Sequence, residues 1–230
     1  MSAAGGTGGP GGTFGRAARG DAALRDQIVA GCRRMVADGL TRGTSGNISA
    51  RTAGGMLITP SNVEYATMDA ADVVAVSLDG EPRDSAGRRA STEWRMHARI
   101  HETRADVKVV VHTHSPYATA LACMRRPIPA FHYMVAAAGG RDVPCAPYAT
   151  FGTVELAATA AAALIDRNAC LLANHGVLAV GPSVSAALGL ALEIETLAQQ
   201  YCIALQAGEP VLLSDAQMAE ALEAFSDYRS

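Results

Sequence analysis

Cysteine and aromatic residues are scarce in this chain of 230 residues. The five cysteines are odd in number and share no short spacing, which argues against a disulfide framework and against a cysteine-type zinc knuckle. Reduced thiols are typical of a cytosolic protein. The first residues also lack the charged region and apolar core of a signal peptide. We therefore expect a cytoplasmic protein.

Long apolar runs and basic stripes are missing as well. No uninterrupted apolar run has the length that spans a bilayer, so we expect no membrane partner. The formal net charge is −3, and the arginine pairs are scattered rather than interleaved with aromatics, which argues against nucleic-acid binding. Apolar residues make up 49% of the chain and charged residues 18%, which is typical of a soluble α/β domain.

The chain has neither an internal repeat nor a linker that would divide it. Residues 1–20 contain eight glycines, and we predict a disordered tail there, followed by one domain over residues 21–230. Hydrophobic periodicity predicts helices over residues 21–39, 91–104, 116–124, 153–167, 184–206 and 215–225. Apolar and β-branched runs predict strands that include residues 56–62, 73–78, 108–111, 169–173 and 177–180, with a long ordered loop over 127–151.

Two histidines follow the most strongly apolar of these strands. Three valines, residues 109–111, come just before His112 and His114. Side chains two apart on a strand point to the same face, so the two imidazoles aim together. Pro116 then ends the strand, because proline has no amide proton to donate to a ladder. The pair is either half of a metal site or two buried, hydrogen-bonded histidines.

A third histidine stands in a turn between two later predicted strands. Gly176 follows His175 and marks a backbone position that needs room or a positive φ. Taken alone, His175 could simply cap the turn. With His112 and His114 it supplies three nitrogen ligands, the donor set of a catalytic divalent metal that keeps an open position. Zn²⁺ is the simplest candidate, and Mn²⁺ or another divalent metal is the alternative.

A glutamate supplies a candidate base beside this metal. Glu93 is predicted in the first turn of the helix over 91–104, where it could also serve only to complement the helix dipole. Partial shielding by Trp94 would raise the pKa of its carboxyl group, which suits proton abstraction near neutral pH. His97 and His101 follow on the same helical face, and we interpret them as surface or interface histidines rather than a second metal pair.

Three short clusters of hydroxyl and amide side chains are candidates for a phosphate site. They are Thr-Ser-Gly-Asn at 44–47, Thr-Pro-Ser-Asn at 59–62 and Ser-Thr at 91–92. The last cluster begins a predicted helix, where the dipole favours anions. Each cluster alone is more often ordinary turn chemistry. No arginine is assigned to this group, so binding would rest mainly on neutral donors.

Seven motifs carry a resemblance to a known family. They are GTSGNIS (43–49), MLITPSN (56–62), STEWRMH (91–97), VVHTHSPYATA (110–120), FHYMVAAAGG (131–140), PCAPYATFGT (144–153) and ANHGVLA (173–179). Through them, residues 21–228 resemble the class II aldolase/adducin superfamily, and within it the bacterial L-fuculose-1-phosphate aldolases. The resemblance implies a single three-layer α/β/α domain with a mixed, largely antiparallel sheet. It also implies a C4 homotetramer with active sites between subunits.

The resemblance implies a role for each matching residue. Zinc would be bound by His112, His114 and His175, and Glu93 would be the acid/base and a contact of the resting metal. Tyr133 would protonate the aldehyde oxygen from a neighbouring subunit. Two further sets complete the site: Tyr228 would assist from a mobile C-terminus, and the substrate phosphate would be held by Gly46, Asn47, Ser61, Asn62, Ser91 and Thr92.

The activity implied is metal-dependent cleavage of a small phosphorylated sugar. L-Fuculose 1-phosphate, or a similar 5-deoxy-ketose 1-phosphate, would yield dihydroxyacetone phosphate and an aldehyde such as lactaldehyde. Other activities in the superfamily remain open: a methylthioribulose-1-phosphate dehydratase, a pentulose-phosphate 4-epimerase or a sugar-acid phosphate decarboxylase. Epimerases look to carry aspartate at the position of Glu93, whereas dehydratases keep similar ligands. A non-catalytic adducin-like role is disfavoured because all the ligands are present.

Two positions depart from the family pattern. Asn62 stands where the family usually has glycine. Asparagine tolerates a left-handed backbone, so we expect phosphate binding to survive while the side chain narrows the pocket. Only two residues follow Tyr228, which puts its implied role in doubt.

Overall fold

The computed structural model describes the backbone of residues 12–80, 82–84 and 87–229. Its centre is an eight-stranded sheet with the strand order β4-β3-β2-β1-β5-β8-β7-β6. The strands are β1 (Asn47–Thr52), β2 (Gly55–Ile58), β3 (Val74–Val76), β4 (Pro82–Asp84), β5 (Val109–Thr113), β6 (Cys145–Ala146), β7 (Ala169–Leu172) and β8 (Gly176–Gly181). All the paired strands are antiparallel except β6 and β7, which pair in parallel.

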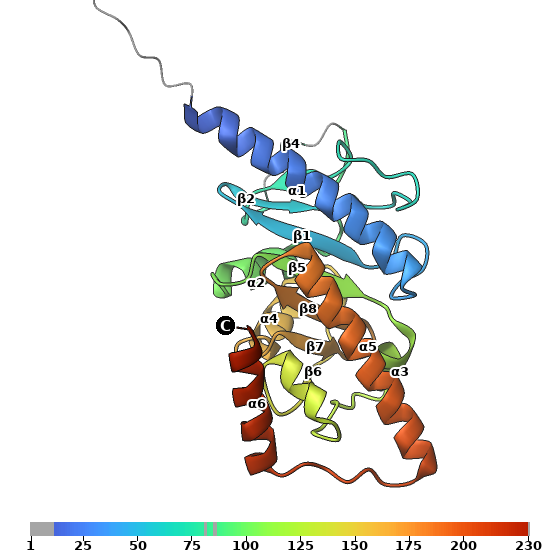
Figure 1. Ribbon diagram of the computed structural model, residues 1–230. Helices are drawn as coiled ribbons and strands as arrows, with labels where there is room; N and C mark the ends of the chain where they lie inside the picture. The colour runs from blue at the N-terminus through green and yellow to red at the C-terminus, as the bar shows by residue number, and fades with distance from the viewer. Residues whose placement is uncertain (1–11, 81, 85–86, 230) are drawn as a thin grey trace, which may run out of the picture.

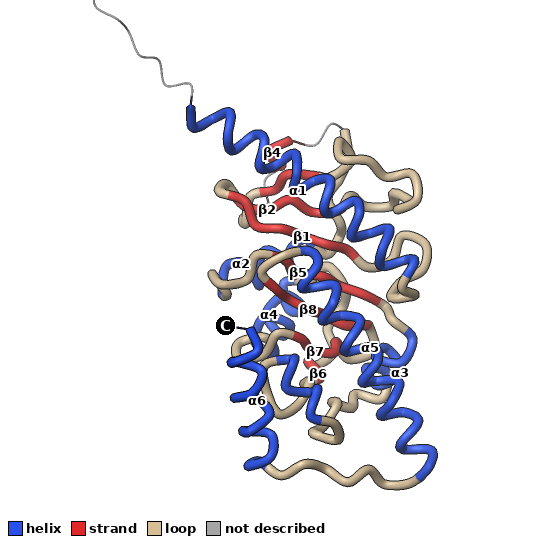
Figure 2. The backbone as a smooth tube through the Cα atoms, in the orientation of Figure 1, coloured by secondary structure: helices blue, strands red, loops and turns tan. Residues whose placement is uncertain are grey.

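Helices cover both faces of this sheet (Figures 1 and 2). Side chains of α1, α3 and α5 pack into one core cluster, and side chains of α2 and α4 pack into another. The helical segments are α1 (Gly12–Ala37), α2 (Trp94–Thr103), α3 (Pro116–Cys123), the 3₁₀ helix η1 (Tyr133–Ala138), α4 (Val154–Ala163), α5 (Val184–Ala207) and α6 (Asp215–Arg229). The predicted three-layer α/β/α domain with a mixed, largely antiparallel sheet is therefore confirmed.

Strand β5 shows why both faces must be covered. Val109 and Val111 belong to the cluster under α1 and α5, whereas Val110 belongs to the cluster under α2 and α4. Successive side chains on a strand point to opposite faces, so a continuous run of valines needs apolar partners on each side. By the same alternation, His112 follows Val110 on the α2 side of the sheet.

Several boundaries differ from the predictions. Helix α1 begins at Gly12, within the predicted tail and before the predicted helix start at residue 21, whereas residues 1–11 of that tail lie outside the described residues. Adding residues to an existing helix avoids the cost of nucleation, and this favours the extension. The predicted loop over 127–151 contains η1 and β6, because β6 pairs with β7 at the sheet edge.

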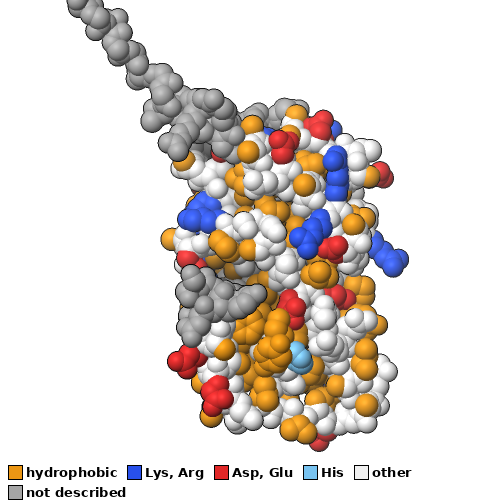
Figure 3. All heavy atoms as spheres, viewed as in Figure 1, with side chains coloured by type: hydrophobic (Ala, Val, Ile, Leu, Met, Phe, Trp, Pro, Cys, Tyr) orange, Lys and Arg blue, Asp and Glu red, His pale blue; other side chains and the backbone are white. Residues whose placement is uncertain are grey.

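The surface shows where polar and apolar side chains gather. On the face in Figure 3, acidic and basic side chains are scattered singly, and apolar side chains gather over the lower half, where α5 and α6 lie in Figure 1. Among the helices that the structure describes, none combines the length and apolar character that a membrane span requires.

Candidate active site

The three histidines predicted as ligands lie together. His112 is near the end of β5, His114 follows the strand, and His175 occupies the turn before β8. Strands β5 and β8 are antiparallel neighbours, with His112 paired to Leu178, and this brings the turn beside the strand end. One ring nitrogen from each histidine lies within 4.8 Å of the others. The predicted convergence of the triad is therefore confirmed.

The protonation of the rings suits metal binding. Nδ1 of His112 is 2.9 Å from the carbonyl oxygen of Val177 and donates to it, so Nε2 presents a lone pair to the site. That Nε2 lies 3.0 Å from Nε2 of His114. Burial lowers the pKa of both histidines, that of His114 to about 4, so both rings are neutral at pH 7. Neutral imidazoles whose Nε2 atoms lie this close can converge on one cation.

The carboxylate of Glu93 completes the donor set. Oε2 lies 3.3 Å from Nε2 of His112, and Oε1 lies 3.2 Å from Nε2 of His175. Oε1 is buried and has no hydrogen-bond partner among the described residues. Three imidazole nitrogens and an adjacent buried carboxylate oxygen fit a divalent cation such as Zn²⁺. The geometry thus fits a metal site of the class II aldolase type.

The pKa expected for Glu93 is corrected by the structure. Burial raises the pKa of this carboxyl group, but attraction to the imidazole of His112, the contact with His175 and the hydrogen bond from the amide of Asn47 outweigh burial and lower the pKa below its usual range. Glu93 stands at the N-cap position before α2, not in its first turn. Trp94 does not shield it, because the indole packs over Gly80 and the cluster between β2, β3 and α2. Glu93 is therefore an anion in the resting site.

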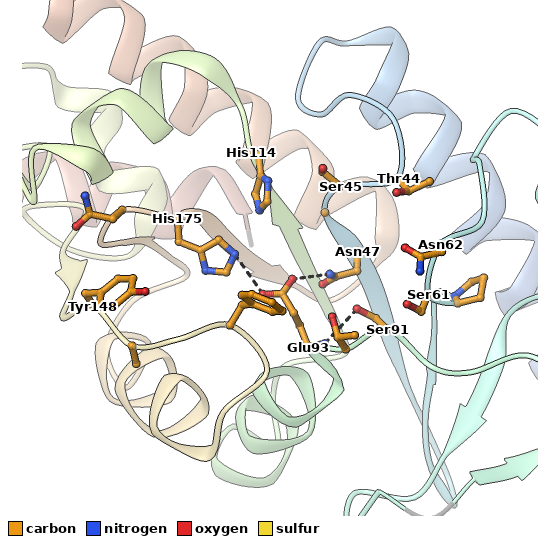
Figure 4. Close-up of a pocket in the computed structure, with 16 residues that line it drawn as sticks. Thr44, Ser45, Asn47, Ser61, Asn62, Ser91, Glu93, His114, Tyr148 and His175 are labelled. Atoms are coloured by element: carbon orange, nitrogen blue, oxygen red, sulfur yellow. Dashed lines mark hydrogen bonds and ion pairs between the residues drawn. The ribbon is translucent and has the colours of Figure 1, made fainter.

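A cavity of about 320 Å³ opens beside the triad (Figure 4). Glu93 lies at its centre, with His114, His175 and Tyr148 on one side and the hydroxyl and amide side chains on the other. No arginine or lysine is among the described residues that line it. All six residues predicted to hold phosphate line this cavity: Gly46, Asn47, Ser61, Asn62, Ser91 and Thr92. Their role in phosphate binding stays a prediction.

Two backbone conformations shape the phosphate end of the cavity. Gly46 has φ +76°, and a Cβ there would lie 2.6 Å from the carbonyl oxygen of His112, so the loop before β1 can lie against the metal strand only with glycine. The phenol of Tyr65 donates to the carbonyl of Gly46 and anchors the same loop. Asn62 has φ +57°, so asparagine adopts a left-handed backbone conformation at the position where the resemblance implies glycine.

Neither predicted tyrosine is among the described residues that line this cavity. Tyr133 is the first residue of η1; its side chain is 55% exposed and does not line the cavity. Tyr228 is in the last part of α6, where the side chains fall outside the described residues. Both assignments therefore stay predictions, and that of Tyr133 requires a second chain.

Sequence reasoning missed several residues at the site. Tyr148, Phe151 and Asn174 line the cavity, and the signal for them was their place in motifs that received no individual roles. The interpretation of His97 and His101 as surface histidines is wrong, because both are buried and hydrogen-bonded. Their spacing of four, next to the apolar Met96 and Ile100, was the available signal of a buried helical face.

Comparisons with known proteins agree with this geometry. Residues 26–202 match the model of the Class II Aldolase and Adducin N-terminal domain. The chain is 48% identical to a 5-methylthioribulose-1-phosphate/5-deoxyribulose-1-phosphate aldolase of Rhodospirillum rubrum, over 90% of this chain and 92% of that protein. It is 45% identical to the L-fuculose phosphate aldolase of Escherichia coli (strain K12), over 89% of this chain and 95% of that protein.

A solved structure shows the same fold. An L-fuculose 1-phosphate aldolase superposes with a TM-score of 0.86 at 40% identity, and the match covers 89% of this chain and 96% of that one. The fold, the histidine triad and the match over most of the chain agree, and the protein belongs to the class II aldolase and adducin family.

Proposed function

We propose that the chain is a metal-dependent ketose 1-phosphate aldolase, a lyase that releases dihydroxyacetone phosphate and an aldehyde. The observation that carries the proposal is the position of the Glu93 carboxylate. It contacts two histidines of the triad and lies between the metal end and the hydroxyl-rich end of one cavity. A ketose 1-phosphate fits this cavity, because its phosphate can occupy the hydroxyl-rich end while oxygens on neighbouring carbons lie at the metal end.

Each end of the cavity has a chemical task. A divalent metal held by His112, His114 and His175 supplies Lewis-acid stabilisation of negative charge on the substrate's oxygens. The neutral hydroxyls, amides and backbone groups at the other end hold the phosphate. Because phosphate lies away from the bond that breaks, its contacts supply binding energy and orientation for the reacting carbons.

Two proton transfers complete the cleavage between carbons 3 and 4. A base takes the proton of the hydroxyl on carbon 4, the C3–C4 bond breaks, and its electron pair forms the enediolate of dihydroxyacetone phosphate. Glu93 then delivers a proton to carbon 3, and it removes that proton in the direction of condensation. Tyr133 of a neighbouring chain exchanges the proton of the aldehyde oxygen. Tyr228 assists from the C-terminal helix.

The substrate is L-fuculose 1-phosphate or a similar 5-deoxy-ketose 1-phosphate. Relatives with names of both kinds are of similar identity, 48% and 45%, so overall similarity does not separate them. Asn62, Tyr148 and Phe151 are among the side chains that line the cavity. Within the same family, a dehydratase, an epimerase or a decarboxylase would release no dihydroxyacetone phosphate, and the product therefore separates these activities.

The first experiment combines a metal assay with a panel of ketose 1-phosphates. We expect zinc, or another divalent metal in its place, at about one ion per chain. We also expect dihydroxyacetone phosphate from L-fuculose 1-phosphate, 5-deoxyribulose 1-phosphate or 5-methylthioribulose 1-phosphate. A metal-loaded protein that converts such a substrate without forming dihydroxyacetone phosphate would contradict the proposal. His114→Ala should lower metal content and activity together.

Glu93→Gln tests the assignment of the base. The amide cannot accept the proton of carbon 3, so exchange of that proton of dihydroxyacetone phosphate with solvent should fall at least roughly a hundredfold. The metal content should stay near that of the parent, because the three histidines remain. Glu209→Gln, an exposed glutamate after α5, is the matched control and should exchange at the parent rate. Parental exchange in Glu93→Gln would reject the assignment.

A further inference from the structure

A line of buried polar side chains runs from the core to Glu93. The amide Nδ2 of Asn47 donates to Oε2 of Glu93 at 2.9 Å, and Oδ1 of Asn47 lies 2.5 Å from Nε2 of His97. Nδ1 of His97 lies 2.7 Å from the hydroxyl of Ser49, and that hydroxyl lies 2.9 Å from Nε2 of His101. Five side chains thus form one continuous hydrogen-bonded chain.

The fold builds this chain from two periodicities. Asn47 and Ser49 are two apart on β1 and point to the same face, while His97 and His101 are one turn apart on α2. All four side chains are buried, and His97 is completely inaccessible. Burial of polar groups is costly unless they are paired, so a buried histidine pair between helix and sheet calls for an explanation.

The chemistry of Glu93 determines the direction of every hydrogen bond. A carboxylate only accepts, so Asn47 must present its NH₂ group to Glu93 and its oxygen to His97. His97 must then carry its proton on Nε2 and accept at Nδ1 from the hydroxyl of Ser49. The hydroxyl oxygen accepts in turn from Nε2 of His101. Each donor therefore points toward the carboxylate.

The state of the two rings agrees with this direction. Burial lowers the pKa of His97 to about 3, and burial together with the charge of Arg51 lowers the pKa of His101 to about 3. Both rings are thus neutral and carry one proton each.

We infer that His97 is a positioning residue that acts through Asn47 to hold the carboxylate of Glu93 in its reactive orientation. The Nε2 proton of His97 keeps the Asn47 amide from rotating by half a turn, which would turn an oxygen toward the carboxylate. Oε2 of Glu93 is thereby tied to Asn47, and Oε1 is held toward the histidine triad, 3.2 Å from Nε2 of His175. This inference rests on the proposed function, because it takes Glu93 to be the group that transfers the proton at carbon 3.

Two substitutions at His97 separate positioning from packing. In His97→Leu the donor to Asn47 is lost, and we expect kcat for cleavage to fall about 10- to 100-fold, with KM within about threefold and metal content unchanged. In His97→Gln the side-chain NH₂ can still donate to Asn47, and most of kcat should return. Thr113→Val, which removes a buried hydroxyl without a hydrogen-bond partner on the metal strand, is the matched control and should keep the parent kcat.

A structural readout tests the same inference without activity. Nitrogen-15 NMR of the metal-loaded protein with labelled histidine should show His97 as the neutral Nε2–H tautomer, with its signals assigned by their loss in His97→Gln. The Nδ1–H tautomer would overturn the inference, as would a folded His97→Leu with parental kcat. If His97→Leu does not fold, the tautomer of His97 measured in the parent protein still tests the inference. A parent that cleaves no ketose phosphate refutes the proposed function, whereas the tautomer still tests the hydrogen-bond direction.

Discussion

Gly176 has no Cβ atom, and this allows the three histidines to come together. The sequence indicated that this residue needs either room or a positive φ, and the structure shows that it needs room. A Cβ at Gly176 would lie 2.4 Å from the carbonyl oxygen of Thr113 and 2.9 Å from the ring of His114. The turn that carries His175 can approach the end of β5 only because this Cβ is absent.

Gly176→Ala should therefore separate the ligands. The added methyl group must push β8 away from β5 or displace the ring of His114, and we expect zinc affinity and kcat to fall at least about tenfold. Equilibrium dialysis with zinc and the cleavage assay measure both. Gly189→Ala is the matched control, because a Cβ at this exposed position on α5 meets nothing within 4 Å. It should be neutral or slightly stabilising, since alanine favours helix over glycine.

His101 should make stability depend on pH. Its folded pKa is lowered to about 3, whereas the ordinary value is about 6.5. The unfolded chain therefore takes up a proton that the folded chain refuses, so the stability is complete above the unfolded pKa and is lost as pH falls toward 3. Between about pH 7 and about pH 5, the parent should lose roughly 2 kcal/mol more than His101→Gln in urea unfolding. Equal losses in both proteins would contradict this prediction.

At the scale of elements, helix α5 holds the segment that follows the metal strand. Glu195 of α5 accepts hydrogen bonds from the backbone amides of Tyr117 and Ala118, each at 2.9 Å, through its two carboxylate oxygens. These amides belong to the first turn of α3, which begins two residues after His114. A carboxylate at a helix N-terminus satisfies free N–H groups and complements the dipole. Glu195 therefore anchors α3 beside the metal site.

Glu195→Ala should destabilise the fold by roughly 1 to 2 kcal/mol, because two backbone donors lose a charged acceptor. Urea unfolding of the metal-free protein measures the change without a contribution from metal binding. Glu209→Ala removes an exposed glutamate beyond the end of α5 and serves as the control. If both variants unfold at the same urea concentration, the contacts of Glu195 add nothing to stability.

At the scale of the whole molecule, the predicted role of Tyr133 depends on a second chain. The residue is exposed on η1 and lies outside the cavity of its own chain. The prediction from the family resemblance is that this tyrosine reaches the site of a neighbouring subunit in a C4 tetramer. A shared site of this kind can be tested by mixing subunits, because each variant then damages a different half of the site.

Subunits of His114→Ala and Tyr133→Phe should complement each other. Each variant alone should be nearly inactive, and random mixing in equal amounts should restore roughly a quarter of the sites, those with an intact triad and an intact neighbouring tyrosine. Activity after denaturation and joint refolding measures this. A mixture of His114→Ala and Glu93→Gln is the control and should stay inactive, since both residues lie on the same side of the site. Failure of the first mixture would place Tyr133 outside the site.

The sequence alone determined which chemical groups the site contains. His112 and His114 had to share a face because strand side chains alternate, and the valines before them had to be covered on both sides. Helices with strong periodicity, such as α5, were predicted nearly to their ends because their apolar residues repeat locally. The left-handed backbone at Asn62 also agrees with the expectation that asparagine replaces glycine there.

Other features were decided only by the tertiary structure, because they depend on contacts between residues distant in sequence. Burial of His97 and His101 follows from the packing of α2 on β1, which a single helix cannot reveal. The pKa of Glu93 is set by burial, which raises it, and by His112, His175 and Asn47, which lower it and come from three other segments. Local sequence patterns report which groups are present and which way they face along one element, whereas charge, burial and hydrogen-bond direction arise where elements meet.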